Sequence, residues 1–173
     1  MKRVALLVQY DGSNFSGWQR QKNANTVQET LERALFKVSH KVVRTFAAGR
    51  TDAGVHAKAQ VAHIDISPDD WYRFRKTSTN NSQENESLLL HRLNRLLTPS
   101  IYISAIREVA GDAHARFDAL SRSYLYRIVT EPSPLRAHQS WYAGGYWNIE
   151  VLNELADQIV GEYDFDTLSK TNP

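Results

Sequence analysis

Residues 42–66, "VVRTFAAGRTDAGVHAKAQVAHIDI", contain two strand-like segments on either side of a glycine-bounded loop. Residues 42–48 are rich in β-branched and aromatic side chains, and residues 55–66 largely alternate between apolar and polar side chains. Both patterns are typical of β-strands. Glycine and aspartate in the loop between them are turn-forming residues. We therefore predict two consecutive strands joined by a loop that carries Arg50 and Asp52.

The amino-terminal segment predicts a strand followed by a helix. Residues 4–10, "VALLVQY", form a short apolar run that ends at the turn-rich sequence "DGSNFSG". Thr26 and Glu29 then have the spacing of a capping box. Apolar residues follow at helical spacing and predict one buried face, made of Val27, Leu31, Ala34, Leu35 and Val38.

Beyond residue 66 the sequence predicts one more helix and one more strand. Residues 76–87, "KTSTNNSQENES", contain no apolar side chain, so we expect a solvated or disordered insertion. A helical pattern follows over residues 87–97, and residues 101–109 alternate as a strand. The resulting order is strand, helix, strand, strand, helix, strand. It predicts an α+β fold of the ferredoxin-like, split βαβ type, with an antiparallel sheet and helices on one face.

The last third of the chain predicts an incomplete second unit. Residues 121–130, "SRSYLYRIVT", are interpreted as a fifth strand, and residues 151–162 as an amphipathic helix. We expect residues 1–110 to form the amino-terminal domain that carries the Asp52 loop. Residues 111–173 are expected to be the truncated start of a second half.

Composition excludes several classes of protein. The chain of 173 residues contains no cysteine, which excludes disulfides, thiol nucleophiles and iron–sulfur clusters and agrees with a reducing compartment. Its mean hydropathy of −0.50 argues against a membrane span. A formal net charge of +2 permits an anionic partner without requiring one.

Arg50 and Asp52 allow a catalytic and a structural interpretation. A guanidinium beside a carboxylate lowers the pKa of the carboxyl group, so Asp52 could serve as an ionised nucleophile or base. The alternative is a polar hairpin tip, for which "TDAG" has suitable chemistry. His56 and His63 have neither a cysteine nor a nearby glutamate to complete a ligand set, so we predict no metal site.

Basic and aromatic residues occur together in two further segments. If residues 121–130 form a strand, Arg122, Tyr124 and Tyr126 lie on one face, and Leu125 points into the core. Such a face suits unstacked nucleotide bases, although a tyrosine pair facing the core has the same pattern. The loop of residues 11–23 mixes Phe15, Trp18, Arg20 and Lys22, as either a nucleic-acid contact or a packed loop with solvated basic ends.

Five segments, in order along the chain, resemble the TruA family of tRNA pseudouridine synthases. They are "YDGSNFSGWQRQ", "TVQETLERAL", "AGRTDAGVHAKAQVAHI", "HARFDALSRSYLYRI" and "GEYDFDTLSK". The resemblance implies that Asp52 is the catalytic aspartate, that Arg50 displaces or holds the flipped nucleotide, and that Tyr124 stacks on the target uracil. It implies RNA binding by Arg20, Lys22, Lys58, Arg116, Arg122 and Tyr126.

The resemblance also implies a reaction and its partners. The expected activity converts uridine to pseudouridine in the anticodon stem-loop of tRNA, without metal or cofactor. The full-length protein is expected to be a cytoplasmic homodimer with no membrane association. Because family members continue into a second half, we expect little activity from these 173 residues alone. An RNA-binding module without chemistry remains the main alternative, and a metal-dependent hydrolase is a weak third.

Overall fold

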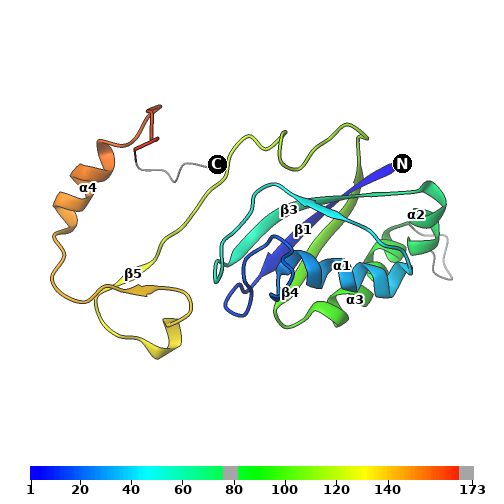
Figure 1. Cartoon of the computed structure of the whole chain (residues 1–173), viewed down its shortest axis with the longest axis horizontal. Coiled ribbons are helices and arrows are strands. Elements are labelled where there is room, and N and C mark those ends of the chain that lie inside the picture. Colours follow the sequence, from blue (N-terminus) through cyan, green and yellow to red (C-terminus); the bar gives the residue numbers. More distant parts are fainter. Residues whose placement is uncertain (76–81, 168–173) are drawn as a thin grey trace. The chain divides into compact units, whose positions relative to one another are not determined.

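The computed structural model describes residues 1–75 and 82–167, which belong to two compact units, residues 1–122 and residues 123–173 (Figure 1). The first unit contains four strands and three helices within its described residues. In chain order they are β1 (Lys2–Tyr10), α1 (Val27–Ser39), β2 (Thr45–Ala47), β3 (Ala57–Ile66), α2 (Pro68–Arg75), α3 (Ser82–Leu97) and β4 (Ile101–Val109).

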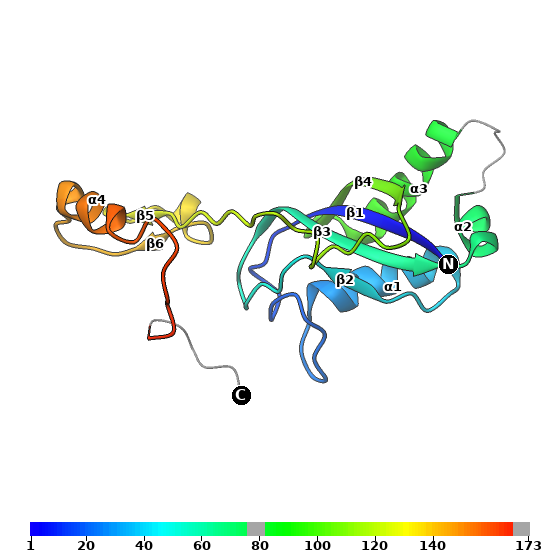
Figure 2. The ribbon, with the colours of Figure 1, turned by 90° about the horizontal axis from the view of Figure 1, so that it is seen from above.

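The four strands form one antiparallel sheet with the order β2-β3-β1-β4. β1 lies in the interior, where Leu6 pairs with Ala62 of β3 and Ile106 of β4. The helices cover one face of this sheet (Figure 2). This topology confirms the predicted α+β, split βαβ fold, because the strands that follow each helix return to opposite sides of β1.

The core lies between the sheet and the helices. Alternate residues of β1, Val4, Leu6 and Val8, are almost completely buried because successive strand side chains point to opposite faces. The predicted apolar face of α1 is buried against them. Thr26 caps α1, since its side-chain oxygen accepts a hydrogen bond from the backbone N–H of Glu29.

Three elements of the first unit differ from the sequence-based expectation. Residues 82–87 belong to α3, so the prediction of a disordered insertion was wrong there, although residue 87 is exposed as a solvated segment requires; residues 76–81 lie outside the described residues. A polar segment still forms a helix when it extends an amphipathic one, because propagation costs less than nucleation. α2 was not predicted, yet it buries Trp71 and Phe74. β2 is limited to Thr45–Ala47.

The second unit has little regular structure in its described part. It contains β5 (Ile128–Val129), a 3-10 turn (Pro134–Arg136), β6 (Trp141–Tyr142) and α4 (Ile149–Asp157). The predicted strand over residues 121–130 was therefore wrong except for β5. Leu125 is 74% exposed rather than buried. Its predicted burial depended on the alternation of side chains between the two faces of a strand, and Leu125 lies outside β5. The late helix is confirmed, although it ends at Asp157.

No helix in the described residues is long and apolar enough to span a bilayer.

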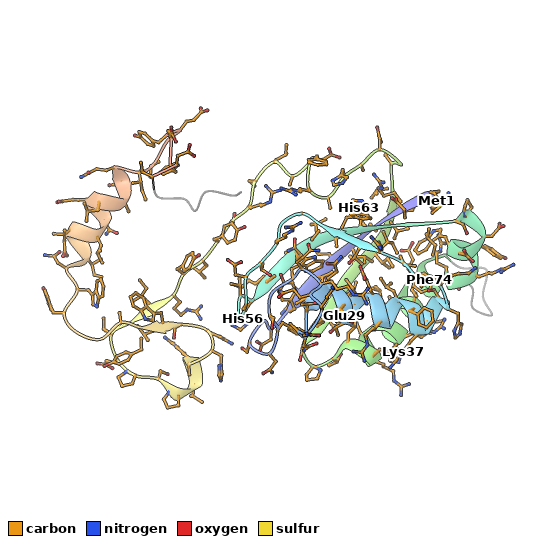
Figure 3. The ribbon with its side chains drawn as sticks, viewed as in Figure 1. Met1, Glu29, Lys37, His56, His63 and Phe74 are labelled. Atoms are coloured by element: carbon orange, nitrogen blue, oxygen red, sulfur yellow. The ribbon has the colours of Figure 1, made fainter. Side chains whose placement is uncertain are left out.

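Residues 110–122, which we call the crossing segment, pass over the sheet face opposite the helices. Arg3 holds Asp65 with two 2.8 Å hydrogen bonds and donates a third, of 3.0 Å, to the Ala113 carbonyl. The Ala115 N–H donates to His63 Nδ1 at 3.2 Å. Figure 3 shows His63 away from the α1 residues Glu29 and Lys37. The crossing segment is therefore attached to β1 and β3 through their outward-facing side chains.

His63 is buried between β2 and the crossing segment. Its ring stacks on Phe46 at a centroid distance of 5.1 Å and meets the edge of His114 at 4.7 Å. Burial lowers the pKa of His63, and the charges of Arg3 and His114 lower it further, whereas Asp65 acts in the opposite direction. The neutral imidazole is the form that can accept the Ala115 N–H.

We predict that acid weakens the fold through His63. Its pKa in the folded chain lies below the ordinary value of 6.5, so the unfolded chain takes up this proton first as the pH falls. The free energy of unfolding should therefore decrease as the pH is lowered from about 6.5. Urea unfolding at a series of pH values measures this, and His63→Gln should flatten the dependence.

His91→Gln is the matched control, because His91 is an exposed residue of α3. That variant should retain the wild-type pH dependence. An unchanged dependence in His63→Gln would contradict the assignment of this pH effect to His63.

Candidate active site

Residues 48–56, which we call the Asp52 loop, connect β2 to β3 and are anchored where they leave β2. The Ala48 N–H donates to the Val61 carbonyl at 2.8 Å, and Gln60 Nε2 donates to the Gly49 carbonyl at 2.7 Å. Both partners lie on β3, so the loop leaves the sheet in a direction set by the neighbouring strand.

The middle of the Asp52 loop is held by two buried aromatic residues. The Tyr10 and Thr51 hydroxyls are 2.8 Å apart, and the Trp18 backbone N–H donates to the Thr51 carbonyl at 2.9 Å. Tyr10 and Trp18 are 3% and 2% exposed, so these partners belong to the core. The residue immediately before Asp52 is thereby tied to β1 and to the loop that follows it.

The end of the Asp52 loop is held in the same way. The Gly54 N–H donates to the Phe15 carbonyl at 3.1 Å, and the Val55 N–H donates to the Asp52 carbonyl at 3.2 Å. His56 Nδ1 lies 3.3 Å from the Gly12 nitrogen and 3.1 Å from a carboxylate oxygen of Asp11. Backbone bonds therefore bracket Asp52 on both sides.

Two glycines allow residues 11–18 to approach the Asp52 loop. A Cβ atom at Gly17 would lie 2.6 Å from the Thr51 carbonyl oxygen, and the backbone φ there is +88°. A Cβ atom at Gly12 would lie 2.0 Å from the Val55 carbonyl oxygen. Only glycine fits at these contacts without moving the backbone.

The side chains of Arg50 and Asp52 are exposed at the surface of this anchored loop. Within residues 1–75 and 82–167 they form no ion pair with each other, so the expectation of a paired guanidinium and carboxylate was wrong. The loop is held instead by its backbone hydrogen bonds and by the side chains of Gln60 and Tyr10. The Asp52 carboxylate is consequently open to a ligand.

The two histidines near the loop have separate partners. His56 lies before β3, beside Gly12 and Asp11, whereas His63 lies within β3 under the crossing segment (Figure 3). The described residues contain no group of three or more His, Cys, Asp or Glu that could hold a metal ion.

The residues predicted to bind RNA occupy different environments. Arg20 lies 3.3 Å from Glu29 and 3.4 Å from Glu32, and Arg122 donates to the Ala48 carbonyl. The remaining side chains are exposed: Lys22, Lys58 and Arg116 in the first unit, and Tyr126 in the second, together with the predicted stacking residue Tyr124. RNA binding by this set stays a prediction.

The residues that hold the Asp52 loop were not identified from the sequence. Trp18 and Phe15 were considered as nucleic-acid contacts, but they are buried, as the packed-loop alternative requires. Tyr10 was assigned only to a strand. The two glycines of "DGSNFSGW" were a usable signal, because glycine marks close backbone approach.

Residues 6–118 match the tRNA pseudouridine synthase family. This range contains the sheet except for the first four residues of β1, together with its helices and the whole Asp52 loop. The chain belongs to this family. The resemblance stated from the five sequence segments is thereby confirmed.

The relatives support the same conclusion over almost the whole chain. The tRNA pseudouridine synthase A of Prochlorococcus marinus strain MIT 9312 is 48% identical over 99% of this chain, which covers 60% of the relative. The protein of that name from Rhodospirillum centenum is 39% identical over 96% of this chain and is 64% covered. The chain therefore spans about three fifths of the length of these curated relatives.

We predict that Gly17→Ala destabilises the fold and displaces the Asp52 loop. The variant combines a positive φ with a clash against the Thr51 carbonyl, so the free energy of unfolding should fall by about 1–3 kcal/mol. Gly111→Ala is the control, because no atom lies within 4 Å of its added Cβ. Equal stability of the two variants in urea unfolding would contradict the proposed close contact.

Proposed function

We propose that this chain provides the catalytic aspartate of an enzyme that isomerises uridine to pseudouridine in tRNA. The observation that carries the proposal is an exposed carboxylate, Asp52, on a loop anchored on both sides by core residues. Membership of the tRNA pseudouridine synthase family supports the same reaction. A rigidly presented carboxylate suits chemistry at a defined atom, because positioning contributes to catalysis before any bond changes.

The reaction itself requires only one such carboxylate. The bond between N1 of the uracil and C1′ of the ribose breaks, the base turns, and a bond forms between C5 and C1′. The proton leaves C5 and N1 gains one, so no water molecule and no second substrate are consumed. A hydrolysing glycosidase usually needs two carboxylates, one to protonate the leaving group and one to activate water or attack. Asp52 is proposed as the nucleophile or base of the isomerisation.

The substrate base must leave its stack before it reaches Asp52. Extruding a base from a stem-loop costs a few kcal/mol, so the enzyme needs groups that stabilise the flipped state. We propose that Arg50 occupies or holds the displaced position and that Tyr124 stacks on the uracil. A basic surface made of Arg20, Lys22, Lys58 and Arg116 would neutralise phosphates of the anticodon stem-loop.

The organisation of the complete protein is also proposed. We propose an amino-terminal domain of residues 1–110 followed by a second half beginning at residue 111, in a cytoplasmic homodimer. In the described part of the second unit, α4 leaves Leu155 and Val151 exposed, at 54% and 46%. Exposed apolar helix faces are normally covered by further structure. RNA binding without chemistry therefore remains the second candidate for these 173 residues alone.

We predict that Asp52→Asn abolishes pseudouridine formation by the complete product of the gene. The amide keeps the shape of the carboxylate but loses its charge and nucleophilicity, so turnover should fall at least about a thousand-fold. The Kd for tRNA should change little, because phosphate contacts dominate affinity. Mass spectrometry of the RNA nucleosides, together with filter binding, measures both quantities.

Asp69→Asn is the matched control, since Asp69 is an exposed carboxylate at the start of α2. That variant should retain wild-type turnover. Normal turnover by Asp52→Asn would return Asp52 to the role of a polar loop residue. Binding of tRNA with no turnover by the wild-type protein would favour the RNA-binding module.

A further inference from the structure

Arg122 uses its guanidinium group on the backbone of its own unit. Its Nε and Nη2 atoms donate to the Ala48 carbonyl at 3.1 and 2.7 Å, and Nη2 also donates to the Arg116 carbonyl at 3.0 Å. One side chain therefore joins the crossing segment to the residue at which the Asp52 loop leaves β2. A planar guanidinium is suited to this arrangement, because its donors are held in a rigid fork.

The contact is built into the surrounding residues. The Ala48 N–H is already bonded to the Val61 carbonyl, so both sides of this residue are held. At Gly49 an added Cβ would lie 3.3 Å from Arg122 Nε, which shows how closely the guanidinium lies against the loop backbone. Gln60 holds the next carbonyl, that of Gly49. Two consecutive carbonyls at the start of the Asp52 loop thus have side-chain donors from different segments.

We infer that Arg122 is a positioning residue that aligns the Asp52 loop for the isomerisation, in place of a direct contact to RNA phosphate. The inference rests on the proposed function of Asp52. The Nε and Nη2 donors of Arg122 are already bonded to the Ala48 and Arg116 carbonyls, and they would have to give up those bonds to bind a phosphate. Asp52 lies four residues beyond Ala48 on the same anchored loop, so displacement of Ala48 moves the start of that loop.

Arg122→Lys and Arg122→Gln in the complete gene product separate the two roles. Lysine keeps the charge but lacks the fork, and glutamine keeps one donor group but lacks the charge. If Arg122 positions the loop, kcat at saturating tRNA should fall about ten- to a hundred-fold in both variants, because small misplacements are costly. The Kd for tRNA should stay within about two-fold in Arg122→Lys.

A phosphate contact gives the opposite pattern. Arg122→Lys would then behave like the wild type. Arg122→Gln would raise the Kd for tRNA and leave kcat unchanged, and the slope of log affinity against log salt concentration would become shallower by about one. That pattern would overturn the inference, as would wild-type kcat in both variants. Arg44→Lys is the control, because Arg44 is exposed and has no side-chain partner among the described residues. It should leave kcat and Kd unchanged.

A second readout does not depend on the activity. Amide hydrogen exchange of residues 49–56 in the 173-residue chain should become several-fold faster in Arg122→Lys, while exchange in β1 stays at the wild-type rate. Unchanged exchange in the loop would overturn the positioning role even if turnover were lost. If the wild-type protein forms no pseudouridine, the proposed function fails, and the exchange experiment still decides what Arg122 does to the loop.

Discussion

The Thr51 carbonyl accepts a hydrogen bond from the Trp18 N–H across a gap that only glycine at position 17 leaves open. This contact joins the loop after β1 to the loop after β2. Because Trp18 and Tyr10 are buried, the position of Asp52 depends on the same core that stabilises the sheet. A polar functional loop is thus attached to apolar packing through backbone atoms. We therefore expect substitution of the core residues around Tyr10 to alter activity as well as stability.

The outer face of the sheet adds a second set of attachments. Arg3 and His63 bind backbone atoms of the crossing segment, and Arg122, at its end, binds the Ala48 carbonyl. Arg3 and His63 thus form hydrogen bonds with main-chain groups of the crossing segment, which is not part of a strand. These side-chain bonds hold the partly exposed segment against the sheet. The fold therefore uses basic residues structurally as well as at its surface.

The sequence predicted most of the elements that pack against the core, but not those that depend on contacts between distant residues. Periodicity predicted β1, α1, β3 and β4, because each buries one face against the core. It failed for residues 121–127, since an aromatic-rich alternating segment forms a strand only when a partner is available. It also missed the start of α3, where polar residues extend an amphipathic helix. The motif around Asp52 identified the family, but the loop's anchors depend on contacts between residues distant in sequence.

The same limit applies to individual side chains at the site. Proximity along the chain suggested that Arg50 and Asp52 interact, whereas their charged groups form no ion pair among the described residues. The family resemblance implied that Arg122 binds RNA, although in the structure it donates hydrogen bonds to carbonyls of its own chain. Charge and residue type show what a side chain is able to bind. Only the fold shows which partner is within reach.

If its anchors hold the Asp52 loop as described, the loop is rigid before RNA binds, and backbone ¹⁵N relaxation of the RNA-free chain measures this rigidity. We expect order parameters of about 0.85 for residues 50–55, equal to those of β1 and β3. Values below about 0.6 in this loop, beside a rigid sheet, would contradict the claim.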